Sequence, residues 1–239
     1  MQEISRKFKR DSENIPTIKL VVIGTGQAGK TSLLKIYSLL MKIAHPEKLL
    51  SNTTKISNPF EETALFDQTI FGLGTKIKNE KEVPIIKYSL YTVAGQRRYR
   101  DARKIVLNGA DGLIVLLDPT NIPGNEEALS ELMYFLEGKS KVPFTVAINK
   151  CDLEDLPLDS DITKALVESG FVADLSNVEI NHISAMSARN ALLGLLSIDP
   201  KELFDADGLI RSEHFPEVVS DIVSMVNRLT HKVIESKIR

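Results

Sequence analysis

The sequence has a single cysteine and lacks any long apolar segment. One thiol, at Cys151, excludes an internal disulfide and favours a reducing compartment. No apolar run exceeds six residues, as in 112–117, whereas a helix needs roughly 20 such residues to cross a bilayer. The N-terminal segment is charged, and neither end carries a lipidation motif. We therefore expect a cytoplasmic protein with no stable membrane anchor.

The chain also lacks an excess of charge of either sign. The 30 Lys and Arg residues and the 32 Asp and Glu residues give a formal net charge of −2. This balance provides no electrostatic argument for a nucleic-acid partner. Hydrophobic residues make up 43% of the 239 residues, which is enough for one sizeable core. Because residues 1–16 are polar, we expect a flexible lead-in there and a single domain at 17–239.

Strand-like and helix-like segments alternate from Thr17 onward. The predicted strands are 17–23, 65–71, 84–91, 113–117, 144–148 and 178–183. The second and third are expected to be antiparallel neighbours, joined by a turn that includes Gly72 and Gly74. The predicted helices are 30–43, 98–107, 126–136, 159–169 and 217–234. This alternation predicts an α/β fold with helices on both faces of the sheet, and residues 187–212 predict an insertion with some helix of its own.

One loop matches the pattern G-x-x-x-x-G-K-[ST] between a predicted strand and a predicted helix. Glycines allow the backbone to turn so that amides point at phosphate oxygens, and the helix N-terminus favours negative charge. Lys30 is expected to reach the β- and γ-phosphates, and the Thr31 hydroxyl is expected to bind Mg²⁺. The predicted nucleotide-binding residues of this loop are Gly24, Thr25, Gly26, Gln27, Ala28, Gly29, Lys30, Thr31 and Ser32.

A second segment, Asn149-Lys150-Cys151-Asp152, follows the predicted strand 144–148. Its aspartate can accept hydrogen bonds from N1–H and the exocyclic amine of guanine, a donor pair that adenine lacks, so the segment predicts guanine selectivity. Asn149 can link the base to the phosphate loop, and the Lys150 stem can lie along the ring. A further base-binding loop is predicted after the last strand, at Ser184, Ala185 and Met186.

Together with TVAGQ at 92–96, these segments resemble the Ras superfamily of small GTPases. The similarity to prokaryotic MglA-type GTPases is closer still, over EETALFDQTIFGLGT and YSLYTVAGQRRYRDARKIVLNGADGLIVLLD. The resemblance covers residues 18–183 and the last helix. It implies a three-layer P-loop NTPase fold, with a six-stranded, mostly parallel sheet and one antiparallel edge strand. It also implies a Mg²⁺–GTP or GDP ligand, slow GTP hydrolysis, switch-loop signalling and a Roadblock-fold partner that stimulates hydrolysis.

The resemblance places the switch residues on two loops. Thr63 occupies the effector-loop position that binds Mg²⁺ and senses the γ-phosphate, with Thr53, Thr54 and Thr69 as competitors. The Gly95 amide can donate to the γ-phosphate, which is present in GTP and absent from GDP. Gln96 matches the glutamine that orients the attacking water. The expected catalytic residues are therefore Gln96 and Lys30, and the expected metal ligands are Thr31 and Thr63.

This sequence departs from the family pattern at three positions. Thr92 stands where most Ras-like proteins have an aspartate that holds Mg²⁺ through water, although the MglA type shares the threonine. Asp118 offers compensation, or it caps the following turn. Ala94 replaces a proline of the MglA type. Glu62 replaces the arginine of that type, and because an arginine finger contributes roughly 10³–10⁵ in rate, we expect very slow unaided turnover. Four arginines that follow Gln96 are candidates to replace that arginine; the alternative is that they only form a solvated helix face. They are Arg97, Arg98, Arg100 and Arg103.

Two alternatives to a slow GTPase remain open. Glu62 motivates the first, a GTP-sensing module with negligible turnover. The second is a P-loop kinase that passes phosphate to a metabolite, although the sequence shows no evident acceptor site and the segment 149–152 favours guanine-nucleotide binding.

Overall fold

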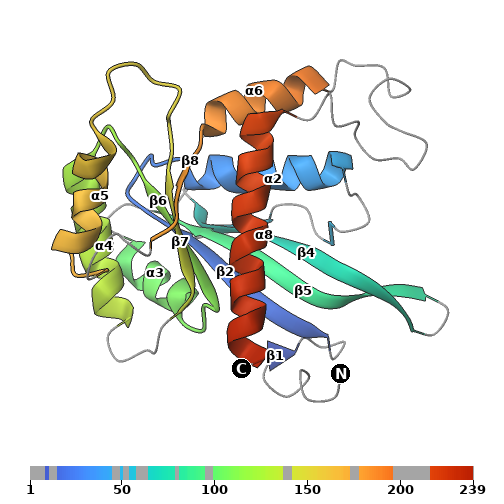
Figure 1. Ribbon diagram of the computed structural model, residues 1–239. Helices are drawn as coiled ribbons and strands as arrows, with labels where there is room; N and C mark the ends of the chain where they lie inside the picture. Colours follow the sequence, from blue (N-terminus) through green and yellow to red (C-terminus); the bar gives the residue numbers. More distant parts are fainter. Residues whose placement is uncertain are drawn as a thin grey trace.

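The computed structural model describes residues 9–10, 15–44, 49–50, 54–57, 64–78, 81–94, 99–136, 142–172, 178–195 and 216–238. They form one sheet with helices on both faces (Figure 1). The strands are β1 (Lys9–Arg10), β2 (Pro16–Ile23), β3 (Thr54–Ser57), β4 (Ala64–Lys78), β5 (Lys81–Val93), β6 (Gly112–Leu117), β7 (Phe144–Ile148) and β8 (Ile180–His182). The helices are α2 (Lys30–Ala44), α3 (Arg100–Leu107), α4 (Ile122–Leu136), α5 (Asp159–Glu168), α6 (Ala185–Leu195) and α8 (Glu217–Ile238).

The order of strands across the sheet confirms the expected fold class. It is β3-β4-β5-β2-β6-β7-β8, with β1 paired to β2. The pairs from β5 through β2, β6 and β7 to β8 are parallel, and β4 is antiparallel to β5. The six predicted strands are therefore all present. Two short antiparallel strands that were not predicted extend them: β3 outside β4, and β1 beside β2.

The predicted turn at Gly72 and Gly74 is wrong. Both glycines lie inside β4, where Gly72 pairs with Lys87 of β5, and pairing continues to Lys78 opposite Lys81. Gly74 takes a φ of +64° without ending the strand. Glycine in a strand can therefore mark a local irregularity rather than its end.

Two helices differ from their predicted bounds by four residues at one end. Helix α4 begins at Ile122, four residues earlier than expected, because Pro123 in its first turn needs no hydrogen-bonded N–H. Helix α8 continues to Ile238. Within the predicted insertion, α6 accounts for residues up to 195, and the remainder to 212 lies outside the described residues. No helix in the described ranges is both long enough and apolar enough to span a membrane.

The core lies on both sides of the sheet. Helices α2, α6 and α8 pack on one face, and α3, α4 and α5 pack on the other (Figure 1). The continuous apolar run of β6 is explained by this arrangement. Ile114 and Leu116 contribute to the first cluster, whereas Leu113, Val115 and Leu117 contribute to the second.

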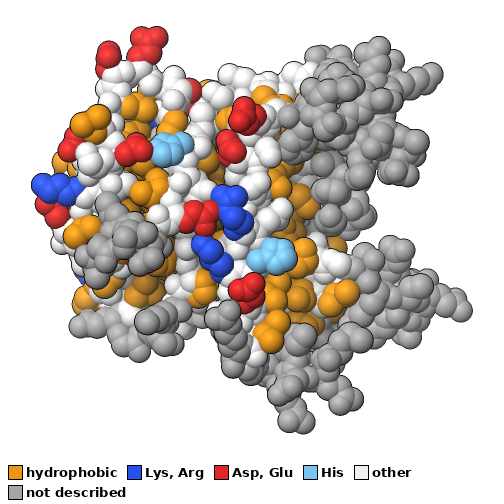
Figure 2. Space-filling model, viewed as in Figure 1, with side chains coloured by type: hydrophobic (Ala, Val, Ile, Leu, Met, Phe, Trp, Pro, Cys, Tyr) orange, Lys and Arg blue, Asp and Glu red, His pale blue; other side chains and the backbone are white. Residues whose placement is uncertain are grey.

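Ion pairs fix the outer side of α8 to the rest of the molecule. Figure 2 shows basic and acidic side chains together over this helix. Arg228 Nε lies 2.5 Å and Lys232 Nζ lies 2.7 Å from the carboxylate of Glu179, next to β8. The hydrogen bond from Lys232 is the main cause that lowers the pKa of Glu179 below its usual value.

Candidate functional site

The predicted site segments meet at one edge of the sheet. The loop 24–29 follows β2, Asp118 follows β6, the segment 149–152 follows β7, and Ser184 follows β8. All four strands are parallel, so their carboxyl ends lie at the same edge, where α/β sheets bind ligands.

The loop after β2 adopts a backbone that requires glycine at two positions. Gly24 has φ +152°, and an added Cβ would lie 2.2 Å from the Leu116 carbonyl oxygen. Gly29 has φ +96°, and its Cβ would lie 2.2 Å from Nδ2 of Asn149. Gln27 also has a positive φ, of 64°. The loop leads directly into the N-terminus of α2, an arrangement suited to binding an anion.

Lys30 closes this loop from the inside. Its side chain is almost fully buried, and Nζ donates to the carbonyl oxygens of Gly24 at 2.8 Å and Thr25 at 2.5 Å. Burial, and after it the positive charge of Arg103, lowers the pKa of Lys30 to about 8. Burial therefore disfavours the charged form of Lys30, and an anion bound in the loop would stabilise that form.

A buried carboxylate that the sequence did not single out lies beside Thr31. Asp67 on β4 is 4% exposed and accepts hydrogen bonds at Oδ2 from Thr31 Oγ1 at 2.9 Å and Thr92 Oγ1 at 3.4 Å. Its other oxygen, Oδ1, is buried and has no hydrogen-bond partner within the described part of the chain. Asp67 and Thr92 are opposite each other in the β4–β5 register. The Asp67 carboxylate therefore lies beside Thr92, the residue that stands where most Ras-like proteins have an aspartate, but it comes from the neighbouring strand.

Asp118 has other partners. Its Oδ2 pairs with Lys150 Nζ at 2.6 Å, and its Oδ1 accepts the Thr120 amide at 3.0 Å. The structure thus favours the turn-capping alternative for Asp118, and the side chain that contacts Thr31 is Asp67 instead.

Asn149 joins three loops. It is 2% exposed. Its Nδ2 donates to the Ala28 carbonyl at 2.8 Å, and its Oδ1 accepts the Ala185 amide at 2.9 Å. The loop after β2 and the loop after β8 are therefore held together by one side chain, in the segment that follows β7.

Asp152 presents an exposed carboxylate beside these loops. Ser184 Oγ donates to Asp152 Oδ1 at 2.5 Å and also accepts the Ser187 amide at 2.9 Å, which caps the start of α6. Ala185 and Met186 are the first residues of that helix. Ser184 thereby orients the carboxylate that the sequence assigns to a base.

Several predicted switch residues lie outside the described residues: Thr53, Glu62, Thr63, Gly95, Gln96, Arg97 and Arg98. Their roles stay predictions. Of the competitors of Thr63, Thr54 is in β3, and Thr69 is fully buried in β4. Neither of these two therefore lies on a loop.

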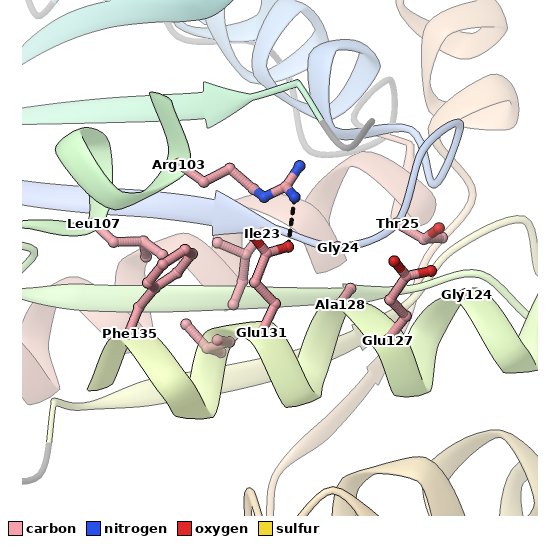
Figure 3. Close-up of a pocket in the computed structure, with 11 residues that line it drawn as sticks. Ile23, Gly24, Thr25, Arg103, Leu107, Gly124, Glu127, Ala128, Glu131 and Phe135 are labelled. Carbon is pink, nitrogen blue, oxygen red and sulfur yellow. Dashed lines mark hydrogen bonds and ion pairs between the residues drawn. The ribbon is translucent and has the colours of Figure 1, made fainter. Parts of the chain in front are cut away.

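The alternative that α3 presents its arginines on a solvated face is wrong for Arg103. Its side chain is 11% exposed and forms an ion pair with Glu131 of α4, while Nη1 donates to the Ala94 carbonyl at 3.0 Å. Arg100 Nε lies 3.5 Å from the same carboxylate. Figure 3 shows Arg103 reaching from α3 toward Glu131, beside a cavity of about 50 Å³ that Gly24 and Thr25 also line.

Comparison with known proteins gives related matches. Residues 19–152 match the family described as Ras of Complex, Roc, domain of DAPkinase. The chain is 30% identical over 154 residues to mutual gliding-motility protein MglA of Myxococcus xanthus, covering 62% of this chain and 74% of that protein. It is 30% identical over 140 residues to Ras-related protein Rab-3C of Mus musculus, covering 57% of this chain and about half, 52%, of that protein. It is 27% identical over 194 residues to Ras-related protein RABA1a of Arabidopsis thaliana, covering 80% and 78%.

Proposed function

We propose, since this chain belongs to the Ras-like GTPase family, that it binds GTP and GDP with Mg²⁺ and acts as a nucleotide-dependent switch with slow hydrolysis. The observation that carries the proposal is the junction at Asn149, because one buried side chain brings the phosphate loop and the base segment together. A ligand that spans both must combine a polyphosphate with a base that offers donors to Asp152. Guanine nucleotides have this chemistry.

Each described part has an assigned role in binding. Backbone amides of the loop 24–31 and the N-terminus of α2 hold the phosphates. Lys30 exchanges its bonds to Gly24 and Thr25 for phosphate oxygens. Asp152, oriented by Ser184, accepts from guanine N1–H and the exocyclic amine. The Ala185 amide donates to Asn149 Oδ1. To contact the guanine O6 as well, this amide would have to be shared between the two oxygens.

The residues around Thr31 fit a magnesium ion. Hard oxygen ligands and one or two carboxylates are typical of Mg²⁺ sites that also involve phosphates. Asp67 supplies a buried carboxylate, one oxygen of which has no hydrogen-bond partner among the residues that the structure describes, next to the hydroxyl that the loop pattern assigns to the metal. We propose that Thr31 and Asp67 hold Mg²⁺, with Thr63 as a further ligand. When bound, the ion would neutralise charge on the β- and γ-phosphates.

For hydrolysis we propose that Gln96 orients water and that Lys30 stabilises the developing charge. Glu62, in place of the family arginine, favours slow turnover. Multiple-turnover release of inorganic phosphate from GTP tests this, with Gln96→Leu as the matched variant. A rate that Gln96→Leu leaves unchanged, with and without candidate partners, favours the GTP sensor. Transfer of the γ-phosphate to a small molecule would favour the kinase.

The binding claim is tested separately by calorimetry of the full chain with GDP, with a GTP analogue that is not hydrolysed, and with ATP, each with Mg²⁺. We expect tight binding of both guanine nucleotides and little binding of ATP. If neither guanine nucleotide binds, the proposed function is wrong.

We further propose, from the family resemblance alone, a partner of the Roadblock fold that binds the GTP form and stimulates hydrolysis. A pull-down of such a domain with the protein loaded with GDP or with the GTP analogue tests this. Equal recovery from both forms would contradict a switch.

A further inference from the structure

We propose that Arg103 is a positioning residue for the γ-phosphate side of the site: it fixes the carbonyl of Ala94, and Glu131 of α4 orients it. This inference rests on the proposed function and assigns a role to residues that the phosphate and base motifs do not include.

The geometry of Arg103 suits two tasks at once. One guanidinium nitrogen, Nη1, donates to the Ala94 carbonyl at 3.0 Å, and the other, Nη2, pairs with Glu131. A guanidinium is a planar fork, so fixing one nitrogen with a carboxylate also sets the direction of the other. The side chains of Arg103 and Glu131 are only 11% and 15% exposed, so solvent screens this ion pair little.

Ala94 is a sensitive place for such a contact. It is the residue directly after β5 and directly before Gly95, whose amide is the predicted donor to the γ-phosphate. A shift of the Ala94 carbonyl rotates the peptide that joins it to Gly95, because the peptide unit is planar. A contact that fixes this carbonyl therefore acts on the part of the site that distinguishes GTP from GDP.

The position of the Arg103–Glu131 pair relative to the phosphate loop agrees with this role. The pair lines the same small cavity as Gly24 and Thr25 (Figure 3). The positive charge of Arg103 is also, after burial, a cause that lowers the pKa of Lys30. Arg100 Nε lies 3.5 Å from the other carboxylate oxygen of Glu131, Oε1, and the Arg100 guanidinium lies 5.1 Å from the Tyr134 ring centroid. The carboxylate is thus held in place from two positions of α3.

The test is the ratio of GTP-analogue affinity to GDP affinity in the full chain with Mg²⁺. Arg103→Lys keeps the charge but offers a single ammonium, which cannot reproduce the fork between Ala94 and Glu131. We expect the analogue affinity to fall about fivefold or more, within the range usual for coupling between sites, while the GDP affinity changes less than about twofold. Glu131→Gln is expected to change the ratio in the same direction by a smaller factor.

Arg228→Gln is the matched control, because Arg228 is also paired with a glutamate, Glu179, but lies on α8, on the opposite face of the sheet from α3 and α4. We expect its ratio to equal that of the wild type. Equal losses for both nucleotides in Arg103→Lys, or an unchanged or raised ratio in both variants, would overturn the positioning role. Should the wild type bind neither nucleotide, the proposed function itself would fail, a result that is distinct from either outcome.

Discussion

Replacing Asp67 with asparagine tests the proposed metal site most directly. The substitution keeps the shape of the side chain and removes its charge. Asp67 contacts the hydroxyl of Thr31, and its other oxygen is buried without a hydrogen-bond partner in the described ranges of the chain. Loss of a group that orients or supplements metal ligands typically costs about 10–100-fold in metal affinity, which corresponds to about 1.4–2.8 kcal/mol.

The free protein is expected to respond in the opposite sense. A buried polar atom without a partner costs about 1–3 kcal/mol, and asparagine removes the charge that makes this burial unfavourable. We therefore expect Asp67→Asn to leave the free energy of unfolding of the nucleotide-free protein unchanged or increased. A mutation that merely damaged the fold would lower it.

The assay is the rate of GDP release as a function of free Mg²⁺ concentration. In Asp67→Asn the midpoint of this dependence should move to about 10–100-fold higher Mg²⁺. Asp118→Asn is the matched control, since this carboxylate is equally buried but pairs with Lys150. That variant should weaken guanine binding and keep the wild-type midpoint. A wild-type midpoint in Asp67→Asn, or a shift of equal size in Asp118→Asn, would refute the reasoning.

Three further results are expected. Asp152→Asn should turn the preference from guanine to xanthine nucleotides; unchanged GTP affinity in a competition assay would contradict the base assignment. Burial lowers the pKa of Lys30 to about 8, and bound phosphate favours its charged form, so GDP affinity should fall up to about tenfold per pH unit above pH 8; a flat fluorescence titration to pH 9 would count against this. Gly29→Ala should abolish nucleotide binding, because the added Cβ would clash with Asn149. An added Cβ at Gly26 meets nothing within 4 Å, so Gly26→Ala should keep the melting temperature of the wild type.

The phosphate and base segments could be located from the sequence because each is continuous. In both cases the residue types and the flanking strand are dictated by local backbone geometry. Gly24 and Gly29, for example, are required by positive φ angles and by close neighbours. Such constraints leave a pattern in adjacent residues.

Asp67 left no such pattern, because its partners are distant in the chain. Thr31 is 36 residues away and Thr92 is 25 residues away. One signal was present in the sequence: Asp67 is a charged residue two and four positions before Thr69 and Phe71, so all three share one face of β4, and that face is buried. The strand register needed to place Asp67 opposite Thr92 is a property of the folded sheet.

The extent of β4 and the burial of Arg103 were missed for related reasons. Cross-strand pairing with β5 carries β4 through Gly72 and Gly74, although isolated glycines favour a turn. The environment of Arg103 depends on Glu131, which belongs to a different helix. Tertiary partners decide both cases, and periodicity along one segment does not contain them.

The junction at Asn149 has a consequence for how the protein is loaded. Its amide contacts the Ala28 carbonyl, 121 residues away in the chain, and the Ala185 amide, 36 residues away, through hydrogen bonds made entirely within the protein. The entropy of bringing these segments together is therefore lost when the chain folds and not when a nucleotide arrives. In the proposed binding of a guanine nucleotide these hydrogen bonds would be kept, and loading would require only diffusion and the local exchange of the Lys30 hydrogen bonds to Gly24 and Thr25.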